Sequence, residues 1–366
     1  MKVGILTSSR ADYGIYLPLL QKMKGDSFFE MEIIAFGTHL SKSHGYTLND
    51  IEKDGYNCIQ TISSLISNDD EQSIASSYGL TVLKFADFWE NHIYDLVFCL
   101  GDRFEMSAAV QAGIPFGVCF AHIHGGETTL GAIDNVYRHQ ITLASKLHFS
   151  SLKVYQNRII ELLGVDENIY TVGSLSLEEI KSFVPIEKNK FHKIFNIPQQ
   201  EFGLVTFHPE TVAFKENNYF ATEMKLALKE IINSINLVIT LPNADTLSSE
   251  YRKVLNEVKF EHSEQVVLIE NFGKINYFSA MYYAKVLIGN TSSGIVEAAS
   301  FGKYVINVGD RQKGRTQSDN IIDTNFISND IIAKTQKALQ LGRYDGNNVY
   351  FKEGSADAII KIIKRI

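Results

Sequence analysis

Short runs of apolar residues recur along this chain, and longer segments with apolar residues at helical spacing separate them. The first half alternates in this way from Val3–Thr7 through Leu96–Leu100 to Tyr170–Val172. Such runs predict buried strands, whereas the segment from about Asp70 to Asn91 has the period of an amphipathic helix. Strands that alternate with helices are typical of right-handed βαβ units in a parallel sheet covered on both faces. The pattern predicts a doubly wound, Rossmann-like α/β domain over residues 1–180.

The alternation restarts after a polar stretch at about Ser182–Gln200. Strands are expected from Phe202–Phe207 to Tyr304–Asn307, with helices between them, so residues 181–345 form a second doubly wound domain. A last amphipathic helix, Ser355–Ile366, falls in a closing segment, 346–366. Two similar α/β domains most simply enclose a ligand cleft between them.

Composition narrows the class of protein. The 366 residues are 45% hydrophobic and 21% charged, with a net charge of −7, and the acidic balance argues against nucleic acid as the main partner. The three cysteines lack metal-ligand spacing and indicate a reducing compartment. The chain starts directly with a predicted strand, and no apolar run approaches the ~20 residues of a membrane span, so we expect a cytoplasmic protein without a membrane partner. The absence of GxGxxG lowers the expectation of a dinucleotide cofactor.

Ionisable residues concentrate between Leu96 and His139, LVFCLGDRFEMSAAVQAGIPFGVCFAHIHGGETTLGAIDNVYRH. One predicted strand stops before Asp102, and the next, Phe116–Phe120, stops before His122 and the group His124–Glu127. Ligands of parallel sheets bind beyond the carboxyl ends of the strands, so these side chains are expected in one crevice, suited to acid/base chemistry. The alternative is a set of strand-end ion pairs and a solvated turn.

Other loops suit an anionic ligand. Asn290–Gly294 lies between a strand and a helix, where backbone N–H groups and hydroxyls favour phosphate, although Ser292 or Ser293 could simply cap the helix. Four further residues have both a binding and a structural interpretation. Glu297 could accept hydrogen bonds from a ribose or be a first-turn acid that complements the helix dipole, and Arg10 and Arg315 could neutralise a diphosphate or be surface cations. His208 could hydrogen-bond a phosphate oxygen or cap the local chain.

The chain resembles a known protein family along nearly its whole length. The pieces SSRADYG, LGDRFE, HIHGGE, the Asp134–His139 segment, GSL at 173–175, FHPET, NAD, IGNTSSGIVE and GDRQKGR occur in the order found in hydrolysing UDP-N-acetylglucosamine 2-epimerases. These enzymes begin sialic acid and related nonulosonic acid synthesis. The resemblance implies a fold like that of GT-B glycosyltransferases, a C-terminal helix that returns to the first domain, UDP held chiefly by the second domain, and a homodimer or homotetramer without metal or redox cofactor.

The resemblance also implies roles for individual residues. Those placed around the sugar are Asp102, Glu127, Asp134 and Arg138, and those that contact the nucleotide or diphosphate are Arg10, His208, Asn243, Ser292, Ser293, Gly294, Glu297 and Arg315. One position departs from the pattern, because some relatives carry Glu where this chain has His124. Either His124 or Glu127 then takes the acid/base task there, and Arg138 orients a carboxylate or contacts the sugar.

The implied reaction suits these residue types. Expelling UDP from C1 while a base removes the proton at C2 gives a 2-acetamidoglycal, and addition of water gives the free 2-epimer, N-acetylmannosamine from UDP-GlcNAc. The base stays open among Asp102, His124, Glu127 and Asp134. A UDP-2,4-diacetamido-2,4,6-trideoxy sugar, on the route to legionaminic acid, is the alternative substrate. Alternatives of another class are a GT-B glycosyltransferase and a non-catalytic sugar-nucleotide sensor.

Overall fold

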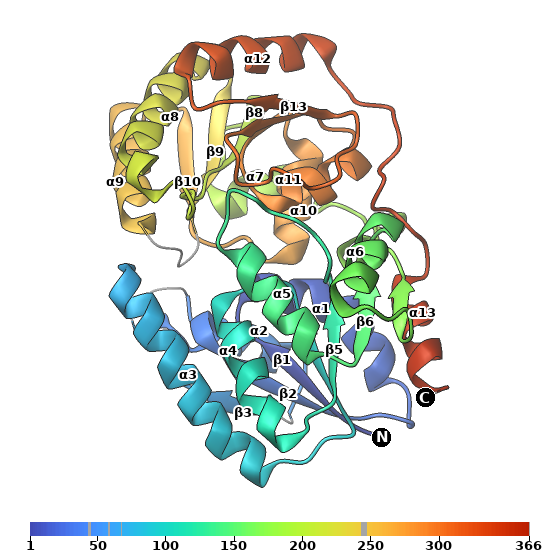
Figure 1. The fold of residues 1–366 in the computed structure, drawn as a ribbon. Helices are drawn as coiled ribbons and strands as arrows, with labels where there is room; N and C mark the ends of the chain where they lie inside the picture. The colour runs from blue at the N-terminus through green and yellow to red at the C-terminus, as the bar shows by residue number, and fades with distance from the viewer. Residues whose placement is uncertain (43–44, 58, 67, 243–246, 366) are drawn as a thin grey trace. The chain divides into compact units, whose positions relative to one another are not determined.

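Two parallel sheets organise the chain, and each belongs to its own compact unit. The computed structural model describes residues 1–42, 45–57, 59–66, 68–242 and 247–365 (Figure 1). The first unit comprises Met1–Glu127, Asp134–Lys181 and Tyr350–Ile366; the second comprises Thr128–Ile133 and Ser182–Val349. The chain therefore visits the second unit for six residues in the middle of the first.

The first sheet has the order β3-β2-β1-β4-β5-β6-β7, with every pairing parallel. Its strands are β1 (Lys2–Thr7), β2 (Glu30–Phe36), β3 (Ile59–Ile62), β4 (Leu96–Leu100), β5 (Phe120–Ile123), β6 (Leu147–Ser150) and β7 (Ile169–Thr171). The helices of this unit are α1 (Arg10–Lys24), α2 (Leu48–Lys53), α3 (Glu71–Asn91), α4 (Phe104–Gly113), α5 (Asp134–Ala144), α6 (Lys153–Leu163) and α13 (Ser355–Ile363).

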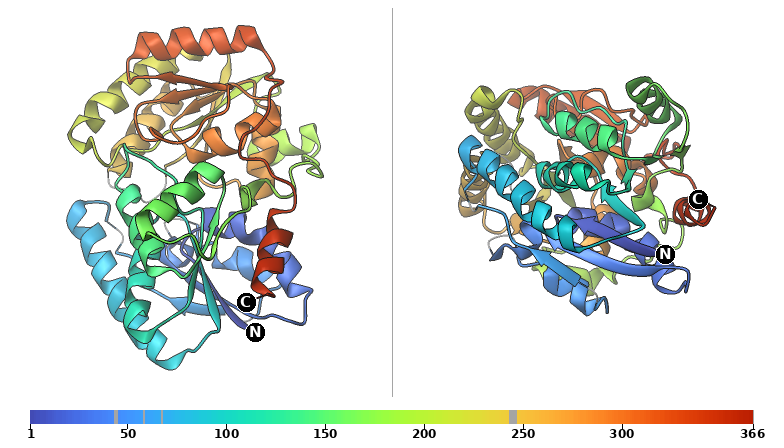
Figure 2. Two further views of the ribbon diagram at one scale, coloured as in Figure 1. Left: turned by 45° about the vertical axis from the view of Figure 1, so that its right-hand side comes forward. Right: turned by 60° about the horizontal axis from the view of Figure 1, so that its bottom comes forward.

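Core residues of this sheet alternate between its two faces, as a doubly covered sheet requires. Ile5 and Ile33 belong to one hydrophobic cluster, whereas their neighbours Leu6 and Ile34 belong to another. The C-terminal helix α13 packs against α1 (Figure 2), and Asp357 on α13 pairs with Lys22 on α1 at 2.7 Å. The last helix is thus part of the first unit.

The second sheet has the order β10-β9-β8-β11-β12-β13, again parallel throughout. Its strands are β8 (Phe202–Thr206), β9 (Asn236–Thr240), β10 (Val266–Ile269), β11 (Leu287–Gly289), β12 (Val305–Val308) and β13 (Ile321–Thr324). The helices are α7 (Lys188–Phe195), α8 (Asn217–Ile231), α9 (Ser248–Glu261), α10 (Lys274–Tyr283), α11 (Ser292–Val296) and α12 (Ser328–Leu341). Two doubly wound parallel sheets confirm the predicted fold class.

Two helices extend into segments that were not predicted as helix, and one predicted strand begins late. Helix α1 begins at Arg10, because the side chain of Ser9 caps it by accepting from the backbone N–H of Asp12. The strand expected at Phe116–Phe120 begins only at Phe120, since Ile114–Phe116 forms a 3₁₀ turn that ends at Gly117 in the left-handed region. The polar stretch before the second sheet contains α7, whose Phe191 is fully buried.

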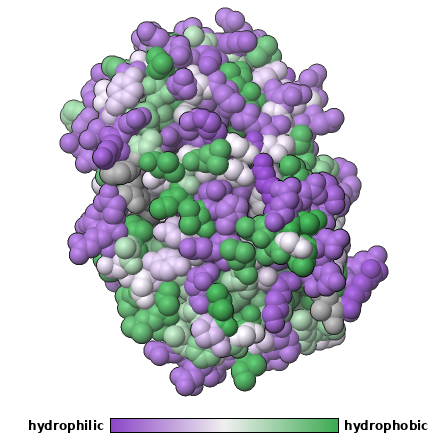
Figure 3. Space-filling model, viewed as in Figure 1, coloured by the Kyte–Doolittle hydropathy of each residue, from purple (hydrophilic) through white to green (hydrophobic). Residues whose placement is uncertain are grey.

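Helix α5 turns a charged residue inward and apolar residues outward. Its buried residues are Arg138, Ile141 and Thr142, whereas Val136 is 54% and Leu143 59% exposed. Figure 3 shows hydrophobic residues among hydrophilic ones on the face of the molecule that carries α5. An inward arginine on a helix with exposed apolar positions departs from the usual amphipathic pattern. No helix of the described residues is long and apolar enough to cross a membrane.

Candidate active site

In each sheet, several candidate residues follow the two strands at which the strand order reverses. Strand β1 lies beside β4 in the first sheet, and β8 lies beside β11 in the second. Loops that leave adjacent strands in opposite directions open a crevice at this position, the usual ligand site of open α/β sheets. Asp102 follows β4 directly, and the Asn290–Gly294 loop follows β11 directly.

The side chain of Arg138 organises the site of the first unit. Its guanidinium pairs with the Asp102 carboxylate and donates to the carbonyl oxygen of Glu127 at 3.0 Å and to Oδ1 of Asn135 at 3.3 Å. Arg138 is only 1% exposed. A cation this deeply buried is held by its fixed partners. The contact with Asp102 is the one that a carboxylate-orienting role for Arg138 would use, and both predicted roles stay predictions.

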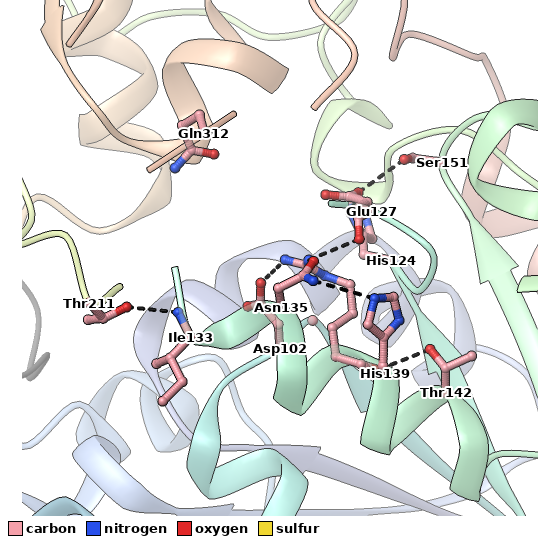
Figure 4. A network of polar contacts seen from close by, with 12 residues as sticks. Asp102, His124, Glu127, Ile133, Asn135, His139, Thr142, Ser151, Thr211 and Gln312 are labelled. Carbon is pink, nitrogen blue, oxygen red and sulfur yellow. Dashed lines mark hydrogen bonds and ion pairs between the residues drawn. The ribbon is translucent and has the colours of Figure 1, made fainter. Parts of the chain in front are cut away.

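His124 and Glu127 form a second contact at the end of β5 (Figure 4). Nδ1 of His124 lies 3.1 Å from Oε1 of Glu127, and the hydroxyl of Ser151 donates to the same oxygen at 3.1 Å. His124 has a left-handed backbone, with φ of 65°, which is uncommon for a residue with a side chain. Gly126 follows with φ of 77°, and a Cβ there would lie 2.3 Å from the carbonyl oxygen of Tyr155. The HIHGGE turn thus requires glycine at Gly126 for Glu127 to reach His124.

Accessibility separates the acid/base candidates. The side chain of Glu127 is 2% exposed and that of His124 11%, whereas that of Asp102 is 23% exposed. Asp134, at the first position of α5, is also partly exposed. A group that exchanges a proton with a substrate must reach it. Asp102 and Asp134 are therefore the more accessible carboxylates of this group, and Glu127 is buried.

His122, expected in the exit loop, lies inside β5 and is fully buried. It pairs with Cys99 of β4 in the sheet register, and its Nε2 lies 2.8 Å from the carbonyl oxygen of Gly101. Burial lowers the pKa of His122 to about 3, so the ring is neutral at physiological pH. Its contact with Gly101 helps to hold the chain just before Asp102.

A buried acidic cluster beside Asp102 was missed by the sequence analysis. Asp12 and Glu105 are 5% and 1% exposed, and Arg103 pairs with Glu105 at 2.9 Å. Burial raises the pKa of both carboxyls, and the charge of Arg103 opposes this rise. Asp12 accepts hydrogen bonds from the backbone N–H and hydroxyl of Ser8. These charged residues are visible in the motifs SSRADYG, which contains Asp12, and LGDRFE, which contains Arg103 and Glu105. Only the fold shows that they come together.

In the second unit, Asn290 joins two loops at the crevice between β8 and β11. Its side chain accepts from the backbone N–H of His208 at 2.8 Å and donates to the carbonyl oxygen of His208 at 2.9 Å. Gln312 in turn donates to the carbonyl oxygen of Asn290 at 2.9 Å. Gly289 precedes Asn290 where a Cβ would lie 1.8 Å from the carbonyl oxygen of Thr206. His208 is thereby fixed against the loop predicted to hold phosphate.

The predicted phosphate loop leads into a short helix rather than a long one. Thr291 precedes α11, and its side chain makes no capping hydrogen bond; Ser292 and Ser293 are the first helical residues. The hydroxyl of Ser293 lies 2.6 Å from that of Tyr277, and Gly294 packs against β12, where a Cβ would lie 3.1 Å from Val305. Because α11 has only five residues, its helix dipole is small. The prediction that this loop binds an anionic ligand therefore depends on its hydroxyls and backbone N–H groups.

Glu210 holds the basic loop at 309–315 in place. Its Oε1 accepts from the backbone N–H groups of Asp310 and Arg311, at 2.6 and 3.2 Å, and Arg311 donates to the carbonyl oxygen of Pro209 at 2.7 Å. Desolvation raises the pKa of Glu210, and these backbone donors oppose the rise. The loop of His208 and the loop of Arg315 are therefore one connected structure.

The remaining predicted residues have the following places. Arg10 begins α1, Glu297 is 7% exposed at the end of α11, and Arg315 is partly exposed. Asn243 lies outside the described residues. Within the described part of the chain, no group of three or more His, Cys, Asp or Glu side chains is placed to hold a metal ion.

The chain is similar to one known protein family along most of its length. The model of a family described as UDP-N-acetylglucosamine 2-epimerase matches residues 21–364. A GDP/UDP-N,N'-diacetylbacillosamine 2-epimerase (hydrolyzing) of Campylobacter jejuni subsp. jejuni serotype O:2 is 35% identical over 88% of this chain and 84% of its own. Polysialic acid biosynthesis protein P7 of Escherichia coli is 31% identical over 99% of this chain and 93% of its own.

Solved structures share the fold over the full length. The UDP-GlcNAc 2-epimerase of Neisseria meningitidis bound to UDP-GlcNAc matches with a TM-score of 0.80 at 15% identity, covering 100% of both chains. That of Methanocaldococcus jannaschii in complex with UDP-GlcNAc and UDP matches with a TM-score of 0.81 at 16% identity, again over 100% of both chains.

Proposed function

Because this chain belongs to the UDP-N-acetylglucosamine 2-epimerase family, we propose that it is a hydrolysing UDP-sugar 2-epimerase. The observation that carries the proposal is the pairing of buried Arg138 with accessible Asp102, directly after the strand at the reversal of the first sheet. A carboxylate fixed in this way suits proton transfer at a sugar carbon. The basic and hydroxyl-rich loops of the second unit supply groups for a diphosphate.

The reaction proceeds in two balanced steps. A base takes the proton from C2 as the C1–O bond breaks, and the electron pair of the C2–H bond forms the C1–C2 double bond while UDP departs with the C1 oxygen. Water then adds across the double bond of the 2-acetamidoglycal: hydroxyl goes to C1, and a proton goes to C2 on the face opposite to the one that lost it. The products are UDP and the free 2-epimer, and no oxidant or reductant is consumed.

Roles follow from accessibility. Asp102 and Asp134 divide the removal of the C2 proton and the delivery of water and proton between them, since they are the accessible carboxylates. His124 and Glu127 shape the floor of the site, and Arg138 positions Asp102. For UDP we assign Arg10, His208, Ser292, Ser293, Gly294, Glu297 and Arg315, together with Asn243.

For the substrate we retain UDP-GlcNAc, with N-acetylmannosamine as the product that feeds sialic acid synthesis. The relation to polysialic acid biosynthesis protein P7, 31% identical over 99% of this chain, favours it. A specific observation favours a second candidate, UDP-2,4-diacetamido-2,4,6-trideoxyglucose. Two relatives, of Campylobacter jejuni at 35% identity and of Legionella pneumophila at 29%, are named as hydrolysing N,N'-diacetylbacillosamine 2-epimerases. We expect the enzyme to work as a homodimer or homotetramer.

One experiment tests reaction and substrate together. Each UDP-sugar is incubated with the protein in deuterium oxide, without an acceptor, and followed by NMR. The proposal expects UDP release, a reducing 2-epimer and one deuterium at C2, faster with UDP-GlcNAc than with the diacetamido sugar. A reversed preference would assign the second substrate. UDP release only in the presence of an acceptor would mean a glycosyltransferase, and binding without C2 deuteration would mean a sensor.

A further inference from the structure

The six residues 128–133, which we call the strap, connect Glu127 to Asp134. These flanking residues belong to the first unit, but the strap itself is part of the second. Its inner part forms a turn, in which the backbone N–H of Ala132 donates to the carbonyl oxygen of Thr129 at 3.1 Å. Thr129 and Ala132 are 3% and 4% exposed, so the strap is a packed element of the second unit.

The strap is anchored to the loop at 309–315 by backbone contacts. The N–H of Leu130 donates to the carbonyl oxygen of Lys313 at 2.9 Å. Gly131 approaches the loop so closely that a Cβ there would lie 2.3 Å from the carbonyl oxygen of Asp310 and 2.7 Å from the backbone nitrogen of Arg311. Even an alanine at residue 131 would therefore push the strap and the loop apart.

A second anchor joins the strap to the loop of His208. The backbone N–H of Ile133 donates to the hydroxyl of Thr211 at 2.8 Å (Figure 4). Thr211 follows Glu210, the residue that holds the loop at 309–315. The strap thus contacts two of the loops to which the proposed function assigns diphosphate contacts, those of His208 and Arg315.

The residues that flank the strap on either side are held by one side chain of the first unit. Arg138 donates to the carbonyl oxygen of Glu127, immediately before the strap, and to the side chain of Asn135, one residue beyond Asp134. The same guanidinium pairs with Asp102. A displacement of the strap is therefore transmitted through the covalent chain to the two groups that fix Arg138, and through Arg138 to Asp102.

We propose that the strap is a positioning element through which the nucleotide loops of the second unit set the Arg138–Asp102 pair, with Gly131 and Thr211 as its positioning residues. Ordering of the loop at 309–315 by a diphosphate fixes the strap, and the fixed strap aligns Asp102 for proton transfer. Misplacement of a reacting group by about 1 Å costs up to ~10²-fold in rate, so a loosened strap lowers turnover without removing any group that touches substrate. The catalytic meaning of this coupling rests on the proposed function.

Hydrogen exchange of backbone amides tests the coupling without relying on activity. In the parent protein, UDP should slow exchange in peptides that cover 309–315, the strap, and the start of α5 at 134–138. In Gly131→Ala, UDP should still slow exchange at 309–315 but no longer at 134–138. Gly79→Ala, at a helical glycine with no atom within 4 Å of the added Cβ, is the matched control, and UDP should slow its exchange in the same peptides as in the parent.

Kinetics supplies the second readout. Gly131→Ala and Thr211→Ala should lower kcat by about 10-fold or more, with the Kd for UDP changed less than about threefold. Thr211→Ser retains the hydroxyl and should restore kcat. Should Gly131→Ala fail to fold, Asn135→Ala is the alternative, because it removes the contact of Arg138 with the segment just after the strap. It should also lower kcat while the Kd for UDP changes little.

Three outcomes would overturn the inference: parental kcat in the strap variants, a parallel loss of UDP affinity and turnover, or the absence of UDP protection at 134–138 in the parent. A parent that binds UDP and shows the protection at 134–138 but releases no free sugar from either UDP-sugar would keep the coupling and remove the proposed function.

Discussion

Arg138 and Asp102 form an ion pair in which the cation is buried and the carboxylate is accessible. The guanidinium is 1% exposed and the carboxyl 23%. The pair joins α5 to the loop after β4, across 36 residues of sequence. This arrangement gives a fixed carboxylate just beyond the carboxyl end of β4, a central strand of the sheet.

Asp102→Asn should keep the affinity for UDP close to the parent value, because UDP is assigned to residues of other loops. Turnover should fall by about 10²-fold or more if Asp102 is an acid/base group. Asp134→Asn should likewise lower turnover and keep the affinity for UDP. The products of the two variants should differ, because a variant defective only in hydration releases 2-acetamidoglycal with UDP, whereas one defective in elimination releases neither. An effect on KM alone would mean that the carboxylate only binds sugar.

Replacing Ser292 and Ser293 together by Ala should weaken UDP binding. UDP protects the parent against thermal unfolding by RT ln(1 + [L]/Kd), so the shift in Tm caused by UDP should shrink in the double variant. Ser300→Ala, which changes a serine that receives a hydrogen bond from Asn348, serves as a control outside the loop. Equal protection of the double variant and the parent would refute the phosphate role of this loop.

Stability should fall as the pH falls from about 6.5 towards 4, because neutral histidines are buried. Burial lowers the pKa of His122 to about 3 and that of His148 to about 4, from 6.5 in the unfolded chain, so the unfolded state binds more protons in this window. Each such group should contribute about 2 kcal/mol of loss between pH 7 and 5.

The raised pKa values of Asp12 and Glu105 act in the opposite direction, since the stability they contribute is lost as the pH rises above the usual carboxyl range. The test therefore compares slopes: His122→Asn should unfold in urea with a weaker pH dependence than the parent between pH 7 and 5. An unchanged slope would contradict the neutral, buried state of His122.

Gly79→Ala should stabilise the protein by about 0.5–1 kcal/mol, which thermal or urea unfolding will measure. Gly79 is an exposed residue within α3, and its added Cβ would meet no atom within 4 Å. Alanine loses less backbone entropy than glycine on entering a helix, and here it causes no clash. Destabilisation of this variant would mean that α3 needs a glycine at this position.

Local pattern was enough to predict the class of fold. Runs such as Leu96–Leu100 are apolar at every position because both faces of a parallel sheet are covered, and that feature is visible in the sequence. Helix α3 was predicted to within one residue, since its apolar positions repeat at helical period and Asp70 caps its start. The family was predicted from ordered motifs, and the family comparison confirmed it.

Boundaries at the site were less predictable, because single hydrogen bonds and glycine conformations set them. The cap at Ser9 extends α1 to Arg10, and the left-handed Gly117 delays β5 until Phe120. That delay moves His122 from a loop into the sheet. Neither effect leaves a periodic signal in the sequence.

The sequence by itself determined which residue types could carry the chemistry and the order in which they occur along the chain. Only the tertiary structure decided which of them meet. It buries Arg138 against Asp102, places His124 on Glu127, and folds the strap into the second unit with Gly131 against Asp310. These contacts join residues far apart in the chain, and their geometry depends on how strands and helices pack, which no local pattern of hydrophobic and polar residues specifies.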